Sequence, residues 1–212
     1  MKQKKLSTIL KNHEKWLRNG SGKKADLSNA DLSYMDLKNA NLRGACLSNT
    51  NLSSANLSNA DLSNADLSNA RLECAILRNA DLRDANLKKT SLSGADLNNA
   101  ELGRADLTHA DLSCTSLRRT NFKDANLSGA DLSWVSCWQD VKGLTVIAVQ
   151  VDTTRRNNQI TYIKELDIWT TGCFQGTLDE LKASIEKTHG DNVKLRKRYY
   201  RVIDFILREA KE

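Results

Sequence analysis

The sequence predicts an all-β solenoid, preceded by a short helix and followed by a small α+β module. Three observations lead to this class. A five-residue pattern repeats without insertion over residues 25–134. A basic, amphipathic segment precedes the repeats, and strand-like and helix-like patterns follow them. The 212-residue chain also contains no proline and only 5% aromatic residues, a bias that indicates a repetitive architecture.

The basic N-terminal segment, residues 1–24, is expected to form a helix that caps the first repeats. One side of this helix would carry four aliphatic residues and a histidine: Leu6, Ile9, Leu10, Leu17 and His13. Ser7 is a candidate N-cap, and Gly20 is a candidate stop. We interpret the positive charge of the segment as a solvated face, and His13 as a residue of the cap interface.

The repeats have leucine at every central position from residue 27 to residue 132 in steps of five, except for Phe122. Two residues before these positions, 17 of the 22 sites are alanine. A period of five matches neither the 3.6 of a helix nor the 2.0 of a strand. It suits a solenoid in which each pentapeptide forms one side and leucine and alanine point inward. Four sides then close a coil of about twenty residues.

The tandem A(D/N)LXX pattern resembles the pentapeptide-repeat proteins, and the resemblance covers residues 25–134. It implies a right-handed quadrilateral β-helix, here of about 5.5 coils. The expected organisation is a basic segment with a capping helix at 1–24, a β-helix at 25–139, and an α+β extension at 140–212. The extension vaguely resembles those of other bacterial and phage members.

The open end of the solenoid and the extension each have their own pattern. A degenerate repeat is expected to form a hydrophobic plug from Trp134, Val135, Cys137 and Trp138. Residues 144–152 and 160–169 flank the polar segment 153–159 and predict a β-hairpin. A capping box of Thr177 and Glu180 then begins a helix that ends at Gly190, and a last helix spans about 193–210.

The composition argues against catalysis and metal binding. Five widely spread cysteines without a CxxC pair, and only three histidines, exclude a disulfide framework and a recognisable zinc site. Cys74 and Cys114 fall two coils apart, about 9.6 Å at strand spacing, which is too far for a disulfide. A filled solenoid offers no concave pocket, so we predict a non-enzymatic protein without cofactor or metal. The lack of a long apolar stretch predicts a cytoplasmic location and no membrane association.

The leading functional prediction is a protein–protein interaction or scaffold protein that presents a rigid repeat surface. Its candidate contact patch lies where the repeat rule breaks, and comprises Arg71, Cys74, Ile76, Arg78 and Arg83. An exposed isoleucine ringed by arginines suits a contact site, and repeat drift is the competing explanation. The identity of the protein partner is open, as is the choice between a monomer and a dimer formed through the C-terminal module.

The resemblance also implies an alternative, a DNA-mimicking modulator of a type II topoisomerase that inhibits gyrase or protects it from quinolones. The repeats carry a net charge of only −3, which gives no strong negative field. Direct nucleic-acid binding is not expected, because no groove-entering motif accompanies the basic residues near the ends of the chain. These residues are Lys2, Lys4, Lys5, Lys194, Arg196, Lys197, Arg198 and Arg201.

Two expectations follow for surface positions of the repeats. The position before each leucine is expected to face solvent, so Asp66→Lys should cost less than about 1 kcal/mol. The asparagines at 39, 59, 79 and 99 share one column, and we interpret them as a side-chain amide ladder.

Overall fold

The computed structural model describes residues 3–151, 159–172 and 174–211, which fall into two compact units. The first unit contains the N-terminal helix and the repeats up to Asp131, together with Val135–Gly143. The second contains Leu132–Trp134 and Leu144–Glu212. Lys2 and most of the predicted turn, residues 153–158, lie outside the described residues.

Helix α1 spans Gln3–Asn19 and packs one face onto the first repeats. Ser7 lies inside this helix, so its predicted role as the N-cap is wrong. Gly20 ends the helix as predicted, with a φ of 71° and its N–H donating to the Trp16 carbonyl at 3.0 Å. Leu6 and His13 are fully buried, and Ile9, Leu10 and Leu17 are half-buried.

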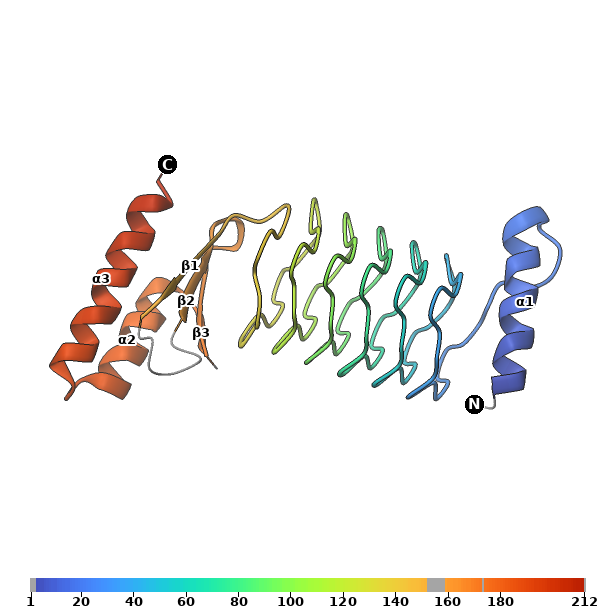
Figure 1. Ribbon diagram of the computed structural model, residues 1–212, viewed down its shortest axis with the longest axis horizontal. Helices are drawn as coiled ribbons and strands as arrows, with labels where there is room; N and C mark the ends of the chain where they lie inside the picture. The colour runs from blue at the N-terminus through green and yellow to red at the C-terminus, as the bar shows by residue number, and fades with distance from the viewer. Residues whose placement is uncertain (1–2, 152–158, 173, 212) are drawn as a thin grey trace. The chain divides into compact units, whose positions relative to one another are not determined.

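The repeats form a β-helix in which parallel bridges join residues twenty apart, from Asp26 with Cys46 to Asp111 with Asp131. Each coil therefore contains four pentapeptides, and Figure 1 shows the successive coils stacked along the first unit. Four ladders of bridges result. We number them by their first members, so ladders 1 to 4 begin at Asp26, Asp31, Asp36 and Asn41.

The stack continues past the last regular repeat by means of a one-residue insertion. Ser116 bridges to Cys137 and Asn121 bridges to Lys142, both at a spacing of 21 residues. The ladders thus extend three residues beyond residue 139. The predicted plug is not formed, because Val135, Cys137 and Trp138 are only half-buried and Trp134 is 40% exposed.

The leucine and alanine columns form the core of this unit. All central leucines and Phe122 are at most 2% exposed. Where threonine replaces alanine, its buried hydroxyl donates to a leucine carbonyl. The leucine belongs to the preceding coil for Thr50, which donates to Leu27 at 2.7 Å, and for Thr90, which donates to Leu67 at 2.9 Å, and to the same coil for Thr115, which donates to Leu112 at 2.6 Å. The hydroxyl is therefore satisfied, which explains why threonine is accepted at an interior position.

The aspartate or asparagine before leucine closes a local turn. Asp26 Oδ1, for example, accepts the backbone N–H of Ser28 at 3.1 Å. The same bond recurs at fourteen further Asp and Asn residues of the repeats. This Asx bond explains why a polar residue precedes leucine in the repeat.

The residue two after leucine, here called the corner residue, has a left-handed backbone in every repeat. Its φ lies between 55° and 60°, or between 67° and 70° where it is glycine. Asparagine and glycine tolerate this region best, which explains their frequency at the corner. The predicted amide ladder is therefore wrong as a general account of the asparagine column, in which a hydrogen bond of 3.1 Å joins only Asn79 to Asn59.

The second unit is a small α+β module built on a four-stranded antiparallel sheet of order β1-β2-β3-β4. Its strands are β1 (Val146–Gln150), β2 (Gln159–Ile163), β3 (Ile168–Thr171) and β4 (Phe174–Gly176). The pairing of β1 with β2 confirms the hairpin. The second predicted strand is broken, because the 3-10 turn Lys164–Leu166 and Asp167, with a φ of 49°, reverse the chain into β3.

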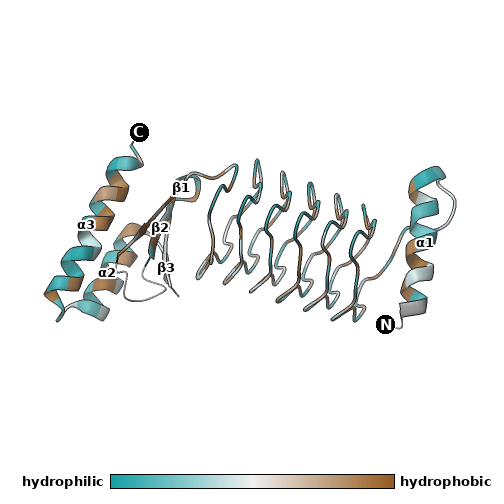
Figure 2. Cartoon of the chain, viewed as in Figure 1, coloured by the Kyte–Doolittle hydropathy of each residue, from teal (hydrophilic) through white to brown (hydrophobic). Residues whose placement is uncertain are grey.

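Two helices complete the module: α2 (Leu178–His189) and α3 (Val193–Glu209). The predicted capping box is confirmed, since Thr177 Oγ1 accepts the Glu180 N–H and Glu180 Oε2 accepts the Thr177 N–H. Both helices carry hydrophobic and hydrophilic residues (Figure 2), as expected of helices with one buried face. The shared core includes Ile160, Trp169, Leu181, Ile203 and Ile206.

His13 links α1 to the first coil. Its Nδ1 accepts the backbone N–H of Ala25 at 3.1 Å, and its ring stacks on Trp16 with centroids 5.4 Å apart. An accepting Nδ1 requires the neutral tautomer with its proton on Nε2. Nε2 is buried and has no hydrogen-bond partner among the described residues. Protonation of the ring would therefore remove the contact to Ala25 and bury a charge.

We expect α1 to loosen as the solution is acidified. Burial, assisted by the charge of Lys24, lowers the pKa of His13, while the Arg43 carbonyl and Glu14 oppose the shift. A folded-state pKa below the unfolded value gives stability that is present above about pH 6.5 and lost as the pH falls. Hydrogen exchange of α1 should speed up between about pH 7 and pH 5 after correction for intrinsic rates. His13→Phe should flatten this dependence, and an equally steep dependence in that variant would contradict the assignment.

Candidate protein-contact surface

The five residues of the predicted patch are all exposed, but they follow one another around one coil. Arg71 and Cys74 belong to the pentapeptide of ladder 2, Ile76 and Arg78 to that of ladder 3, and Arg83 to that of ladder 4. Ile76 is 40% exposed. Ile76 and the arginines therefore do not lie in a single ladder.

Each arginine of the patch is engaged by a carboxylate. Arg71 Nε lies 3.3 Å from Glu73 Oε1, and Arg78 Nε lies 2.5 Å from Asp96 Oδ2. Arg83 makes two bonds to Asp81, at 2.9 Å and 2.5 Å. The exposed isoleucine is thus bordered by charge pairs instead of free cations, and a partner would meet a nearly neutral surface.

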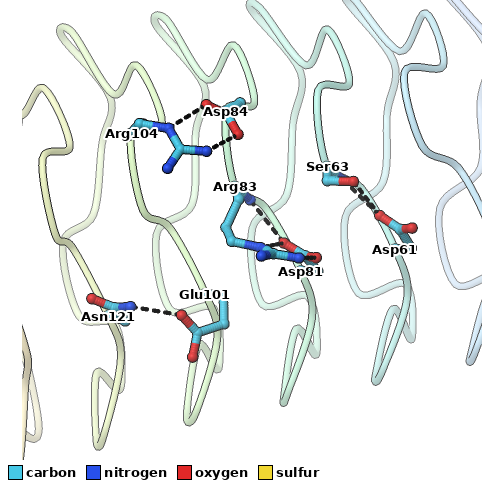
Figure 3. Close-up of polar contacts among 8 residues, drawn as sticks. All are labelled: Asp61, Ser63, Asp81, Arg83, Asp84, Glu101, Arg104 and Asn121. Carbon is cyan, nitrogen blue, oxygen red and sulfur yellow. Dashed lines mark hydrogen bonds and ion pairs between the residues drawn. The ribbon is translucent and has the colours of Figure 1, made fainter.

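Ladder 4 tests whether the repeats present a continuous acidic column. The Arg83 guanidinium lowers the pKa of Asp81 through its hydrogen bonds (Figure 3). At the corner of the same pentapeptide, Arg104 lowers the pKa of Asp84 from one coil away, with bonds of 2.7 Å and 2.6 Å. Next along the ladder, Glu101 accepts a hydrogen bond from Asn121 at 2.7 Å. Asp81 is therefore paired with a cation and Glu101 with an amide, whereas the Asp61 carboxylate accepts only the N–H and hydroxyl of Ser63 among the described residues. An arginine thus interrupts the negative charge of this ladder at Asp81.

Within the described ranges, the thiols and the other potential ligands form no reactive cluster. Cys46, Cys74, Cys114 and Cys137 are free. A Cβ placed on Gly94 would lie 3.3 Å from Cys74 Sγ, because Gly94 occupies the corner between the two thiols that the sequence places two coils apart. Among the residues that the structure describes, no group of histidine, cysteine and carboxylate side chains could hold a metal ion. None of the described helices is both long and apolar enough to cross a bilayer.

The module contains a pocket that sequence reasoning missed. Its volume is about 210 Å³. Its lining is mainly aromatic and aliphatic, with hydroxyls at the edge, and includes Trp134, Phe174, Leu181, Ser184, Thr188 and Tyr199. The sequence did hold one signal for it, because Trp134 occupies a corner position that asparagine or glycine fills in half of the repeats.

These features define the class of protein, a repeat β-helix with a separate α+β module. A family model for pentapeptide repeats matches residues 23–59, 60–99 and 100–136. The matched ranges make up more than half of the chain, which therefore belongs to the pentapeptide-repeat family. None of the curated proteins compared with the chain matches it.

Solved structures of the same family resemble the chain. HetL from the cyanobacterium Nostoc, a protein involved in heterocyst differentiation regulation, is 31% identical over 55% of this chain and 65% of its own, with a TM-score of 0.29. Another pentapeptide repeat protein from Nostoc is 33% identical over 60% of this chain and 95% of its own, with a TM-score of 0.44. QnrB1, a plasmid-mediated fluoroquinolone resistance protein, is 21% identical over 56% of this chain and 77% of its own, with a TM-score of 0.27.

Proposed function

We propose that this is a non-enzymatic interaction protein whose repeats present a rigid surface to a protein partner. The carrying observation is the closed core, in which every central leucine is at most 2% exposed. The surface side chains above it are held by Asx bonds and ion pairs. A surface ordered in this way loses little conformational entropy when a partner binds, which favours affinity.

We further propose that the β-helix is right-handed and quadrilateral, with about 5.5 coils. The bridge spacing of twenty residues supports this form, because it divides each coil into four pentapeptides of equal length. Each pentapeptide has one left-handed corner residue, which gives four changes of direction in a coil. An extended, flat side would then display each ladder to the partner.

Ile76 is proposed as the centre of the contact surface. It replaces the Asp or Asn that would accept the N–H of residue 78, so its presence forfeits an Asx bond and leaves an exposed apolar side chain. Ile76→Asn should restore that bond and leave the repeats at least as stable, by about 1 kcal/mol at most. Arg71→Asn makes the matched change at the same repeat position of ladder 2.

The experiment is affinity capture from extracts of the native host, followed by mass spectrometry and titration of the captured protein. We expect Ile76→Asn to weaken binding about tenfold or more, with an unchanged or higher melting temperature, and Arg71→Asn to have a smaller effect. Equal binding by wild type and Ile76→Asn would mean that Ile76 is not part of the contact surface.

The DNA-mimic alternative draws no specific support from the surface, because the Arg83–Asp81 pair interrupts ladder 4 and Arg104 pairs with the corner residue Asp84 beside it. The likeness to QnrB1, at 21% identity, bears on the fold alone. A gyrase supercoiling assay separates the two functions. We expect no inhibition and no quinolone protection, whereas salt-sensitive modulation would favour the alternative.

A further inference from the structure

Tyr34 is the most exposed large hydrophobic side chain in the described part of the chain, at 81%. It is a corner residue with a φ of 59°. Asparagine or glycine would adopt this backbone at lower cost, and tyrosine recovers nothing by packing. Its hydroxyl makes no hydrogen bond to any residue that the structure describes. The fold of the first unit therefore does not explain a tyrosine here.

Trp134 shows what an aromatic corner residue does when it has a partner. It lies in the same register as Tyr34, one hundred residues later, and has a φ of 57°. Its backbone N–H donates to the Gly172 carbonyl at 3.0 Å. A Cβ on Gly172 would lie only 3.2 Å from the indole, so the ring packs directly on the module. Tyr34 has the same strained backbone without such a contact.

The pocket beside Trp134 has the size and chemistry for a phenol side chain. Its volume of about 210 Å³ leaves room for a single aromatic side chain. Phe174 and Tyr199 supply aromatic walls, and the His189 ring stacks on Tyr199 with centroids 5.2 Å apart. Ser184 and Thr188 supply hydroxyls that bond to no other described residue, so a phenolic oxygen could bind there.

The charges around the two features are complementary. Tyr34 stands between Asp31 and Asp36, both of which are exposed. The pocket is bordered in sequence by Lys187 on α2 and Arg198 on α3, which are also exposed, while Glu186, the acidic neighbour of Lys187, is bonded to Arg196 and Tyr200. A molecule that inserts Tyr34 would bring acidic side chains towards basic ones.

We propose that Tyr34 of one molecule inserts into the pocket of the module on a second copy of the chain. A single insertion leaves an unused Tyr34 on one molecule and an unused pocket on the other, so the contact can either close reciprocally into a two-fold dimer or add further copies head to tail. The association goes beyond the proposed binding of a protein partner and does not depend on it. A contact of this small size gives weak affinity, in the micromolar to millimolar range.

Sedimentation equilibrium from about 5 to about 500 µM tests the proposal over this range. Wild type should show mass that rises with concentration, and association should weaken as salt is raised. Tyr34→Asn should be monomeric and at least as thermostable, because asparagine suits the corner. Lys89→Asn is the matched control, since it makes the same corner change at another exposed site and should associate like wild type.

A complementation experiment tests the pocket itself. Ser184→Trp should fill the pocket and abolish association while leaving Tyr34 intact. A mixture of the Tyr34→Asn variant, which keeps the pocket, and the Ser184→Trp variant, which keeps Tyr34, should give a 1:1 heterodimer and nothing larger. If Ser184→Trp does not fold, Thr188→Trp at the exposed edge of the pocket replaces it. A monomeric wild type at the highest concentration, undiminished association of Tyr34→Asn, or no heterodimer in the mixture would each overturn the proposal.

Discussion

Leu67→Lys is expected to lower the melting temperature of the repeats well below that of wild type, or to leave the repeats partly unfolded at room temperature. Leu67 is 0% exposed and lies between coils whose equivalent leucines, Leu47 and Leu87, are equally buried. A lysine there would place an unpaired ammonium among aliphatic side chains, which costs at least several kcal/mol. That is a large part of the stability of a domain of this size. Circular dichroism melts would show either a lower transition or a partly unfolded chain at room temperature.

The matched control is Asn69→Lys, which adds the same charge two residues away. Asn69 is an exposed corner residue, and the next coil already has lysine at the equivalent corner, Lys89, with a φ of 55°. The control should therefore cost only about 1 kcal/mol, the penalty for a non-glycine, non-asparagine corner. Similar melts for Leu67→Lys and Asn69→Lys would mean that the inward register of the leucine column is wrong.

Asp66 shows where reasoning from the repeat pattern is incomplete. The pattern places it on the surface, and from this alone its replacement by lysine is expected to be nearly neutral. In the structure Asp66 is half-buried, and its Oδ1 accepts the Ser68 N–H at 3.1 Å and the Asn86 side-chain amide at 2.9 Å. Loss of both bonds raises the expected cost of Asp66→Lys to about 1–2 kcal/mol. A repeat position that faces solvent can therefore still be constrained by the hydrogen bonds that its side chain makes.

The β-helix was predictable because each pentapeptide contains the residues that determine its own conformation. Leucine and alanine specify the interior, and the bridges observed at a spacing of twenty residues follow from the period. The corner conformation was also encoded, since asparagine and glycine occupy half of the corner positions. It was missed because asparagines in one column also suggest an amide ladder, and only dihedral angles separate the two explanations.

The contact surface was less predictable, because it depends on which charged side chains meet. Arg78 pairs with Asp96, eighteen residues away, and Arg104 pairs with Asp84, twenty residues away. Such pairs depend on side-chain conformations across neighbouring coils, which the repeat pattern does not encode. The pocket of the module was hidden for a related reason, since it combines Trp134 from the last repeat with side chains of β4, α2 and α3.

Trp169→Ala is expected to unfold the module while the repeats stay folded. Trp169 is 1% exposed in β3 and packs on Tyr162 with ring centroids 4.6 Å apart. Removal of a buried tryptophan costs about 3–5 kcal/mol. A unit of this size is stable by only about 5 kcal/mol, so much of the module population should unfold.

Hydrogen exchange with site resolution can follow the two units separately in the full chain. In Trp169→Ala, amides of β1 to β3 should lose protection, while those of the leucine columns should keep the values of wild type, because the repeats have their own core. Phe205→Ala is the control within the module. Phe205 is 42% exposed, so its removal should cost less than about 1 kcal/mol and leave β1 to β3 protected. Equal loss of protection in the repeats and the module of Trp169→Ala would mean that the two units fold as one.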